Sequence, residues 1–202
     1  MPHEPSQDAS PQDLSAVAWP VRTARLTLRP ATATDVEPTH RIRSLPGVSH
    51  WLTRLPGALE EYRQGFLSPT RLAKTLVVEH EGVVVGDLML TIGDAWAQSE
   101  VADRAVGTQA ELGWVVDPRY AGRGLATEAA EELLRICFED LGLRRATALC
   151  FADHAATRRV MEKVGMRCEE LTRRESLHRS GQWLDGAGYA VLADEWRERQ
   201  LR

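Results

Sequence analysis

The sequence predicts one α/β domain in which a single mixed sheet carries helices on both sides. Three observations favour this fold. Short apolar runs recur along the chain, an amphipathic helix follows a glycine-rich loop, and strand, loop, helix, strand and helix succeed one another over residues 111–165. The 202 residues suffice for one domain with a sizeable core. We expect residues 1–20, rich in Pro, Ser, Gln and Asp, to be a disordered leader, and residues 21–202 to form the domain. A leader with Trp19 pinned against the domain is the alternative.

The first half of the chain is expected to supply three strands and two short helices. Pro30 stops the first strand, and further prolines limit the helices. The turn Glu81-Gly82 joins the next two strands into a hairpin, whose uninterrupted valines favour a strand covered on both faces. In order, the expected elements are a strand at 25–29, helices at 35–44 and 58–66, and strands at 76–79 and 83–90.

The second half is expected to supply four strands and two helices, without an internal repeat. Asp117-Pro118 ends the first of these strands, because Pro lacks the backbone donor that pairing needs. The first helix ends near Gly142, and the second runs from an N-cap at Asp153 to Gly165. The expected strands cover residues 111–116, 145–151, 166–171 and 189–192.

The loop before the first of these helices has the features of an anion site. Gly122 and Gly124 let the backbone bend sharply at a helix start, where unpaired N–H groups and the helix dipole attract a phosphate. The loop lacks the pattern of a P-loop. Thr127 stands where a dinucleotide fingerprint needs Gly or Ala, and Asp153 lies too far downstream for the acidic residue of that fingerprint. A dinucleotide site is therefore disfavoured, and a tight turn without a ligand stays open.

Composition excludes several classes of protein. The net charge of −4 argues against a general nucleic-acid binder, and no apolar run approaches the roughly 20 residues of a membrane span. Cys137, Cys150 and Cys168 have no metal or redox spacing, so we expect small buried side chains in a cytoplasmic protein. The basic run 173–179 predicts a solvated hairpin, with contact to an acidic substrate as the alternative.

Several motifs in a fixed order resemble the GCN5-related N-acetyltransferases (GNAT), most closely the branch that acetylates ribosomal-protein N-termini and similar amines. The loop pattern of that family is met by Arg119, Gly122 and Gly124. The other motifs are Leu26-Thr27-Leu28-Arg29-Pro30, Glu111-Leu112-Gly113-Trp114, Met161-Glu162-Lys163-Val164-Gly165-Met166 and Leu192-Ala193-Asp194-Glu195-Trp196. The resemblance implies a mixed, mostly antiparallel twisted sheet of about seven strands with helices on both faces.

The resemblance also implies acetyl-CoA as cosubstrate. Backbone N–H groups of the loop would cradle its pyrophosphate, with Arg119 and Arg123 adding charge-assisted contacts, and the pantetheine arm would lie along the preceding strand. A main-chain N–H of that strand would bind the thioester carbonyl as negative charge develops on it. The residues expected at the cosubstrate are Trp114, Val115, Val116, Arg119, Tyr120, Ala121, Gly122, Arg123, Gly124, Leu125, Ala126, Thr127, His154 and Thr157.

Direct transfer to an amine needs a base, because an amine like that of lysine is protonated at neutral pH. Glu111, on the strand beside the cosubstrate, is the predicted base, with a structural carboxylate paired to an arginine as the alternative. Thr157 matches the position of a serine near the cosubstrate sulfur in the resembling branch. His154 stands where that branch has asparagine, and Met161 where many relatives have a tyrosine acid.

Related enzymes shape the acceptor pocket around the segment that here carries Arg41, Trp51, Arg54 and Tyr62. The acidic, aromatic connection 93–107 is predicted either to help receive a cationic amine or to be a mobile surface insertion. A protein N-terminus, an aminoglycoside, a polyamine or a small amino compound would all suit the scaffold. The resemblance suggests a homodimer.

Three functional interpretations follow. The chain is predicted to be an acetyl-CoA-dependent N-acetyltransferase. One alternative is a CoA-binding regulatory or interaction module without turnover, which the histidine at position 154 keeps open. The other is a dinucleotide-binding redox protein, which would need a ribose-binding acidic residue that the sequence does not offer.

Overall fold

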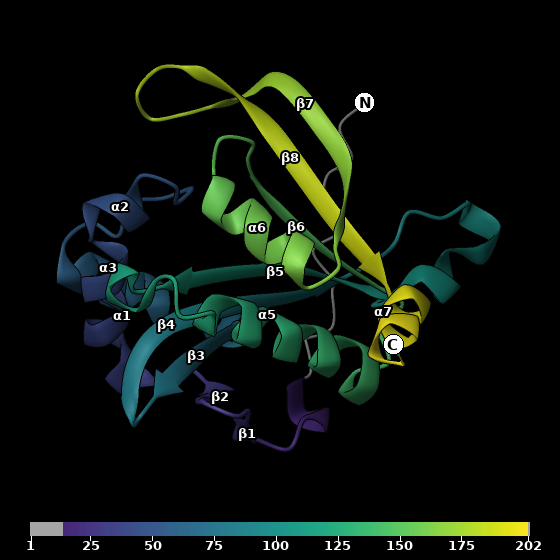
Figure 1. The fold of residues 1–202 in the computed structure, drawn as a ribbon, viewed down its shortest axis with the longest axis horizontal. Helices are drawn as coiled ribbons and strands as arrows, with labels where there is room; N and C mark the ends of the chain where they lie inside the picture. Colours follow the sequence, from purple (N-terminus) through teal and green to yellow (C-terminus); the bar gives the residue numbers. More distant parts are fainter. Residues whose placement is uncertain (1–13, 202) are drawn as a thin grey trace.

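Eight strands form one open sheet in the order β1-β2-β3-β4-β5-β6-β8-β7 in the computed structural model, which describes residues 14–201 (Figure 1). Among these residues, β5 and β6 are the one parallel pair, so the expected mixed, mostly antiparallel sheet is confirmed. The added strand is β1, which is too short for its pattern to stand out in the sequence. The strands are β1 Val21–Arg22, β2 Leu26–Pro30, β3 Thr75–His80, β4 Val83–Gly93, β5 Gln109–Val116, β6 Arg145–Phe151, β7 Arg167–Leu177 and β8 Trp183–Leu192.

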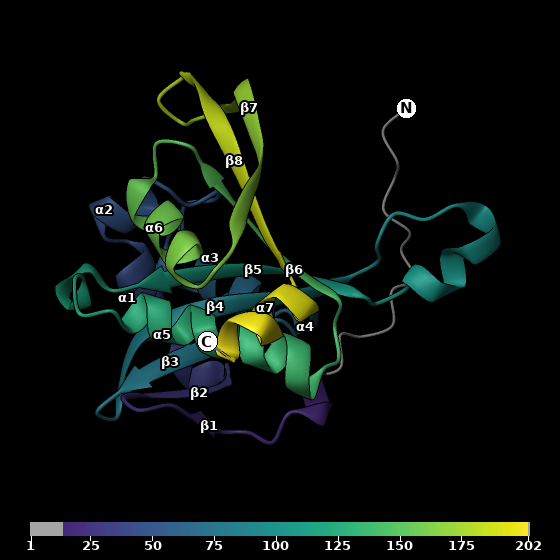
Figure 2. The same ribbon diagram turned by 45° about the vertical axis from the view of Figure 1, so that its right-hand side comes forward.

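Helices cover both faces of the sheet, as predicted. Figures 1 and 2 show α5, α6 and α7 on one face and the short helices α1 to α4 on the other. Their bounds are α1 Val36–Arg43, α2 Pro46–Ser49, α3 Leu59–Phe66, α4 Pro69–Leu72, α5 Leu125–Arg135, α6 Ala155–Lys163 and α7 Ala193–Gln200. No helix within residues 14–201 is long and apolar enough to cross a membrane.

Each face of the sheet has its own apolar core. The larger core lies under α5, α6 and α7, and the smaller one joins α1 and α3 to β3. The middle of β4 is buried from Val85 to Leu88, which confirms the expectation of a strand covered on both faces. The smaller core consists of Ala31, Val36, Tyr62, Phe66 and Val77.

The helix α5 is anchored firmly to the sheet. It buries Leu125, Ala129, Ala130, Leu133 and Leu134 on one side, as its helical spacing requires. Each fully buried leucine contributes about 1.5–3 kcal/mol of hydrophobic stabilisation. The helix continues through a π turn and ends before a glycine with positive φ, at the expected end of the helix. The start of α5 is therefore a rigid support for the loop that precedes it.

The boundary of the domain lies earlier in the chain than expected. Residues 1–13 of the expected leader lie outside the described residues, but residues 14–20 fold against the domain. Val17 is 4% exposed within the larger core, and the Trp19 indole packs against the same core. The Trp19 N–H also donates to the Leu14 carbonyl at 3.0 Å. Apolar side chains at Val17 and Trp19 thus outweigh the polar composition around them.

Two local expectations are wrong, and a third holds with one exception. The N-cap of α6 is His154 rather than Asp153, and the cap has no side-chain hydrogen bond, because a backbone turn precedes the helix. Cys168 is exposed, since β7 lies at the edge of the sheet and its residues are nearly all open to solvent. The basic run 173–179 lies in the β7–β8 hairpin and is mostly exposed, as predicted, although His178 at the turn is buried.

Candidate active site

The strands β5 and β6 separate in the middle of the sheet. They pair only from Gln109 with Arg145 to Glu111 with Thr147. Beyond that point β5 continues to Val116 paired to β4, and β6 continues paired to β8, so the two strands diverge (Figure 1). The edge of β5 beyond Glu111 therefore has no strand partner on the side of β6. An extended ligand can add to such an edge as an extra strand.

The glycine loop lies at the far end of this open edge. A short turn, Pro118–Tyr120, follows β5, and the loop then enters α5 through Gly122 with φ +76° and Gly124 with φ +79°. Both positions need glycine, because this left-handed conformation is strained for other residues. The first helical hydrogen bond runs from the Glu128 N–H to the Gly124 carbonyl at 3.0 Å, so the N–H groups of the first turn have no helical acceptor. This is the geometry expected of an anion site.

A buried carboxylate fixes the entry to the loop. Asp117 accepts hydrogen bonds from the backbone N–H of Arg119 at 3.0 Å and from its guanidinium at 2.6 Å. The hydrogen bond from the Arg119 side chain is the main reason that the pKa of Asp117 lies below its usual value. Arg119 is thus partly committed to Asp117, although its side chain stays exposed. Arg123 lies over the Tyr120 ring, 5.5 Å from its centroid, and is exposed.

Glu111 lies where the strands part, on the sheet face opposite α5. Its neighbours Ala110 and Leu112 point into the core under α5, so strand alternation turns Glu111 the other way. Its side chain is exposed, and it forms no hydrogen bond or ion pair with any residue from 14 to 201. The alternative of a structural carboxylate paired to an arginine therefore has no support within this part of the chain.

A cluster of aromatic and histidine rings lies beyond the end of β6. Trp51, just after α2, stacks on His154 with ring centroids 4.5 Å apart and planes 9° apart. His178 from the hairpin packs against Phe151 at 5.5 Å and against His50 at 4.6 Å. We call these five residues the ring cluster. It joins α2, the start of α6 and the β7–β8 hairpin, three segments far apart in the sequence.

Protonation of His154 is opposed by its surroundings. Burial, and then the nearby His50, lower the pKa of His154 below that of a free histidine. Between the lowered pKa and the usual value of about 6.5, the unfolded chain binds a proton that the folded chain does not. The free energy of unfolding should therefore fall as the pH drops from 7 to 5, with a slope of at most about 1.4 kcal/mol per pH unit from this group.

Urea denaturation at both pH values measures this slope. The H154N variant is expected to lose part of the pH dependence, whereas H40N, a substitution outside the ring cluster, should keep it. An unchanged slope in H154N would show that His154 does not contribute.

The remaining residues singled out in the sequence differ in burial, and two of them lie in the core. Thr157 lies half-buried in the first turn of α6, and its hydroxyl has no hydrogen-bond partner within the described chain. Met161 is buried in the core, so no acid group occupies the position of the tyrosine in many relatives. Tyr62 is buried too, with its hydroxyl 3.1 Å from the Thr39 hydroxyl, and therefore does not line an open acceptor pocket. Arg54 is exposed.

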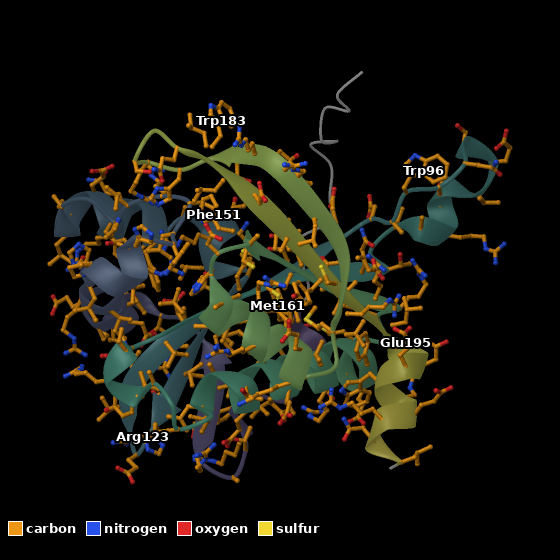
Figure 3. The ribbon with its side chains drawn as sticks, turned by 45° about the horizontal axis from the view of Figure 1, so that its top comes forward. Trp96, Arg123, Phe151, Met161, Trp183 and Glu195 are labelled. Atoms are coloured by element: carbon orange, nitrogen blue, oxygen red, sulfur yellow. The ribbon has the colours of Figure 1, made fainter. Side chains whose placement is uncertain are left out.

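The connection 93–107 projects away from the body of the molecule (Figure 2). It contains a 3-10 turn, Ser99–Ala105, and its base is closed by Asp94, which accepts a hydrogen bond from the Gly107 N–H at 2.7 Å. Trp96 is 87% exposed and lies at the opposite end of the molecule from Arg123 (Figure 3). The connection enters β5 at Gln109, at the end of the strand opposite to the glycine loop. Its role, an acceptor contact or a surface insertion, stays a prediction.

Two features of the site are absent from the sequence prediction. One is the stack of Trp51 on His154, and the other is a set of contacts from Arg25 to the glycine loop. Both join residues more than ninety positions apart, so no local pattern indicates them. Among residues 14–201 no group of three His, Cys, Asp or Glu side chains is placed to hold a metal ion.

Comparison with known proteins identifies the fold and its chemistry. The acetyltransferase (GNAT) domain family matches residues 25–167. N-acetyltransferase YnaD of Bacillus subtilis, itself uncharacterized, is 37% identical over 86 residues, which are 43% of this chain and only 50% of that protein. L-amino acid N-acetyltransferase AaaT of Escherichia coli is 27% identical over 80% of this chain and 94% of its own length.

Among solved structures, Mycobacterium smegmatis RimJ in complex with CoA-disulfide is similar with a TM-score of 0.68 and 26% identity. The similarity covers 84% of this chain and 83% of RimJ. These findings contradict the interpretation as a dinucleotide-binding redox protein. The family match covers most of the described residues and includes the parted strands and the glycine loop, so the chain belongs to the GNAT family of acetyl-CoA-dependent N-acetyltransferases.

Proposed function

We propose that this protein transfers the acetyl group of acetyl-CoA directly to a primary amine at the point where β5 and β6 part. The observation that carries this proposal is the end of β5–β6 pairing at Glu111 and Thr147, with the glycine loop following the open edge. The pyrophosphate binds the N–H groups at the start of α5. The pantetheine arm pairs with the edge of β5 from Trp114 to Val116, which brings the thioester towards Glu111.

Glu111 is proposed as the base, acting directly or through one water. Its carboxylate is exposed and free of ion pairs within the described chain, so it is available to take a proton from the acceptor's ammonium group and leave the neutral amine that attacks the thioester. A main-chain N–H of the open β5 edge binds the thioester oxygen as charge develops. The Thr157 hydroxyl, unpaired among residues 14–201 at the start of α6, supports the leaving thiolate.

The acceptor approaches from the face of the sheet that Glu111 shares with α1 and α2. On this side the ring cluster forms one wall, because Trp51 and Phe151 lie at the end of the parted strand β6. The relative AaaT is named an L-amino acid N-acetyltransferase, which makes free amino acids one acceptor class to test, beside peptides with a free N-terminus, polyamines and aminoglycosides. A homodimer and a cytoplasmic location stay predictions.

Calorimetric titration with acetyl-CoA, with NAD as control ligand, tests the cosubstrate assignment. We expect acetyl-CoA to bind and NAD not to bind. A thiol-release assay with the four acceptor classes then tests turnover, and mass spectrometry of the product should show one added acetyl group. Binding of acetyl-CoA without thiol release for any amine would favour a CoA-binding module. Binding of neither ligand would contradict the proposed site.

A further inference from the structure

Residues 23–25, just before β2, reach the glycine loop from a distant part of the sequence. The Arg25 guanidinium donates to the Arg123 carbonyl at 2.7 Å and to the Glu128 carboxylate at 2.7 Å, 103 positions downstream. Glu128 also accepts from the Thr23 hydroxyl at 2.5 Å and from the Arg25 backbone N–H at 2.9 Å. We call Thr23, Arg25, Arg123 and Glu128 the loop brace. It ties the exposed loop to the first turn of α5.

The loop brace sets the direction of one peptide group in the loop. The peptide between Arg123 and Gly124 is trans, so its N–H points opposite to its carbonyl. Because Arg25 holds the carbonyl, the Gly124 N–H is turned away from Arg25. A free carbonyl at this position would be able to turn its partial negative charge towards a bound phosphate. Arg25 prevents that rotation.

Glu128 keeps its negative charge within the loop brace. Burial alone would raise the pKa of Glu128, but the hydrogen bonds from Thr23 and Arg25 outweigh it and hold that pKa below its usual value. Glu128 therefore stays ionised and keeps the guanidinium in place. A pocket of about 450 Å³ opens beside the loop brace, on the Arg25 side of the loop. Its lining residues are Ala24, Arg25, Gly124, Thr127, Glu128, Glu131 and Lys163.

We propose that Arg25 is a positioning residue for the pyrophosphate of acetyl-CoA, acting by fixing the Arg123 carbonyl so that the Gly124 N–H faces the anion. The proposal rests on the proposed function, since it presumes that the glycine loop binds the pyrophosphate. Arg25 acts on the nucleotide end of the cosubstrate and not on the thioester or the acceptor. Loss of the Arg25 side chain is thus expected to weaken the binding only of ligands that contain the pyrophosphate.

The R25A variant and two thioesters test this inference. S-acetylpantetheine carries the same acetyl group as acetyl-CoA but lacks the nucleotide and its pyrophosphate. In R25A, kcat/KM for acetyl-CoA should fall about ten- to hundredfold, the range for losing a hydrogen bond to a charged group. The kcat at saturating acetyl-CoA and the kcat/KM for S-acetylpantetheine should stay within twofold of wild type. A general loss of structure would lower both values of kcat/KM.

Further variants separate orientation from charge. R25K keeps the charge, but a lysine ammonium cannot span the carbonyl and the carboxylate in the way the planar guanidinium does, so most of the loss should remain. E128Q, which weakens the hold on Arg25, should show the same ligand-selective loss and replaces R25A if that variant does not fold. R22A is the matched control, because Arg22 bonds to Thr27 and does not reach the loop.

Two results would overturn the inference. In the first, R25A loses nothing with acetyl-CoA. In the second, it loses equally with both thioesters. Full activity of R25K would assign the effect to charge and likewise overturn the positioning role. Failure of the wild-type protein to bind acetyl-CoA is a different result, since it contradicts the proposed function itself.

Discussion

Replacing Glu111 by glutamine is expected to lower kcat by about 10²- to 10⁴-fold, the usual contribution of a general base. Glutamine keeps the size of the side chain but cannot take a proton from the acceptor's ammonium group to form the attacking amine. Glu111 lies at the last paired position of β5 and β6, away from the glycine loop. The dissociation constant for acetyl-CoA should therefore stay unchanged in calorimetry, while thiol release by the same preparation falls.

The matched control is E170Q. Glu170 is an exposed glutamate on β7, and its carboxylate, like that of Glu111, has no ion pair within residues 14–201. Its replacement changes the net charge by the same amount but leaves the parted strands intact, so kcat should stay within twofold of wild type. An E111Q enzyme with wild-type kcat would show that another group or the solvent takes the proton. A loss of acetyl-CoA binding would make Glu111 a structural residue instead.

The glycine loop could be predicted from the sequence because its determinants are local. Gly122 and Gly124 both adopt positive φ, and the amphipathic pattern of α5 begins directly after them. The same holds for the β3–β4 hairpin, where Glu81 and Gly82 turn the chain with φ of 52° and 76°. Within these segments each residue contacts neighbours a few positions away, so the spacing of residue types is enough to predict the local structure.

The contacts that complete the site depend on the topology of the sheet instead. Arg25 meets Glu128, and the His178 ring meets the His50 carbonyl, across separations of 103 and 128 positions. A single sequence does not show which distant strands become neighbours in the sheet. These contacts therefore could not be predicted from the sequence. The exposure of Cys168 has the same origin, because an edge strand differs from a central one only through its place in the sheet.

Replacing Asp87 by alanine is expected to destabilise the protein by at most about 3–5 kcal/mol, the cost of leaving a fully buried charge without its partner. The Arg43 side chain is 21% exposed, so solvent offsets part of this cost. Asp87 lies in β4 and its side chain is 2% exposed. It accepts two hydrogen bonds from the Arg43 guanidinium of α1, one of them at 2.9 Å. Burial alone would lower the pKa of Arg43, but the Asp87 carboxylate outweighs burial and raises it. Arg43 would thus remain charged in D87A and uncompensated.

The double variant R43M/D87L separates the value of the pair from the cost of breaking it. Buried ion pairs replaced by apolar side chains of similar volume are often neutral or stabilising, so this variant should recover most of the free energy of unfolding lost in D87A. Urea denaturation gives the free energy of unfolding of the wild type, D87A and R43M/D87L. The control is D103A, a substitution in the exposed 93–107 connection, whose free energy of unfolding should stay within about 0.5 kcal/mol of the wild-type value.

The R43M/D87L variant also tests the active site, because Asp87 pairs across the sheet with Val115 of β5, the strand proposed to carry the pantetheine arm. If the pair only stabilises the fold, R43M/D87L should bind acetyl-CoA as wild type does. If the double variant is stable but binds acetyl-CoA weakly, the pair has a second role, to hold β5 in the position that the cosubstrate needs. A D87A protein as stable as wild type would show that solvent around the partly exposed Arg43 compensates fully for the lost carboxylate.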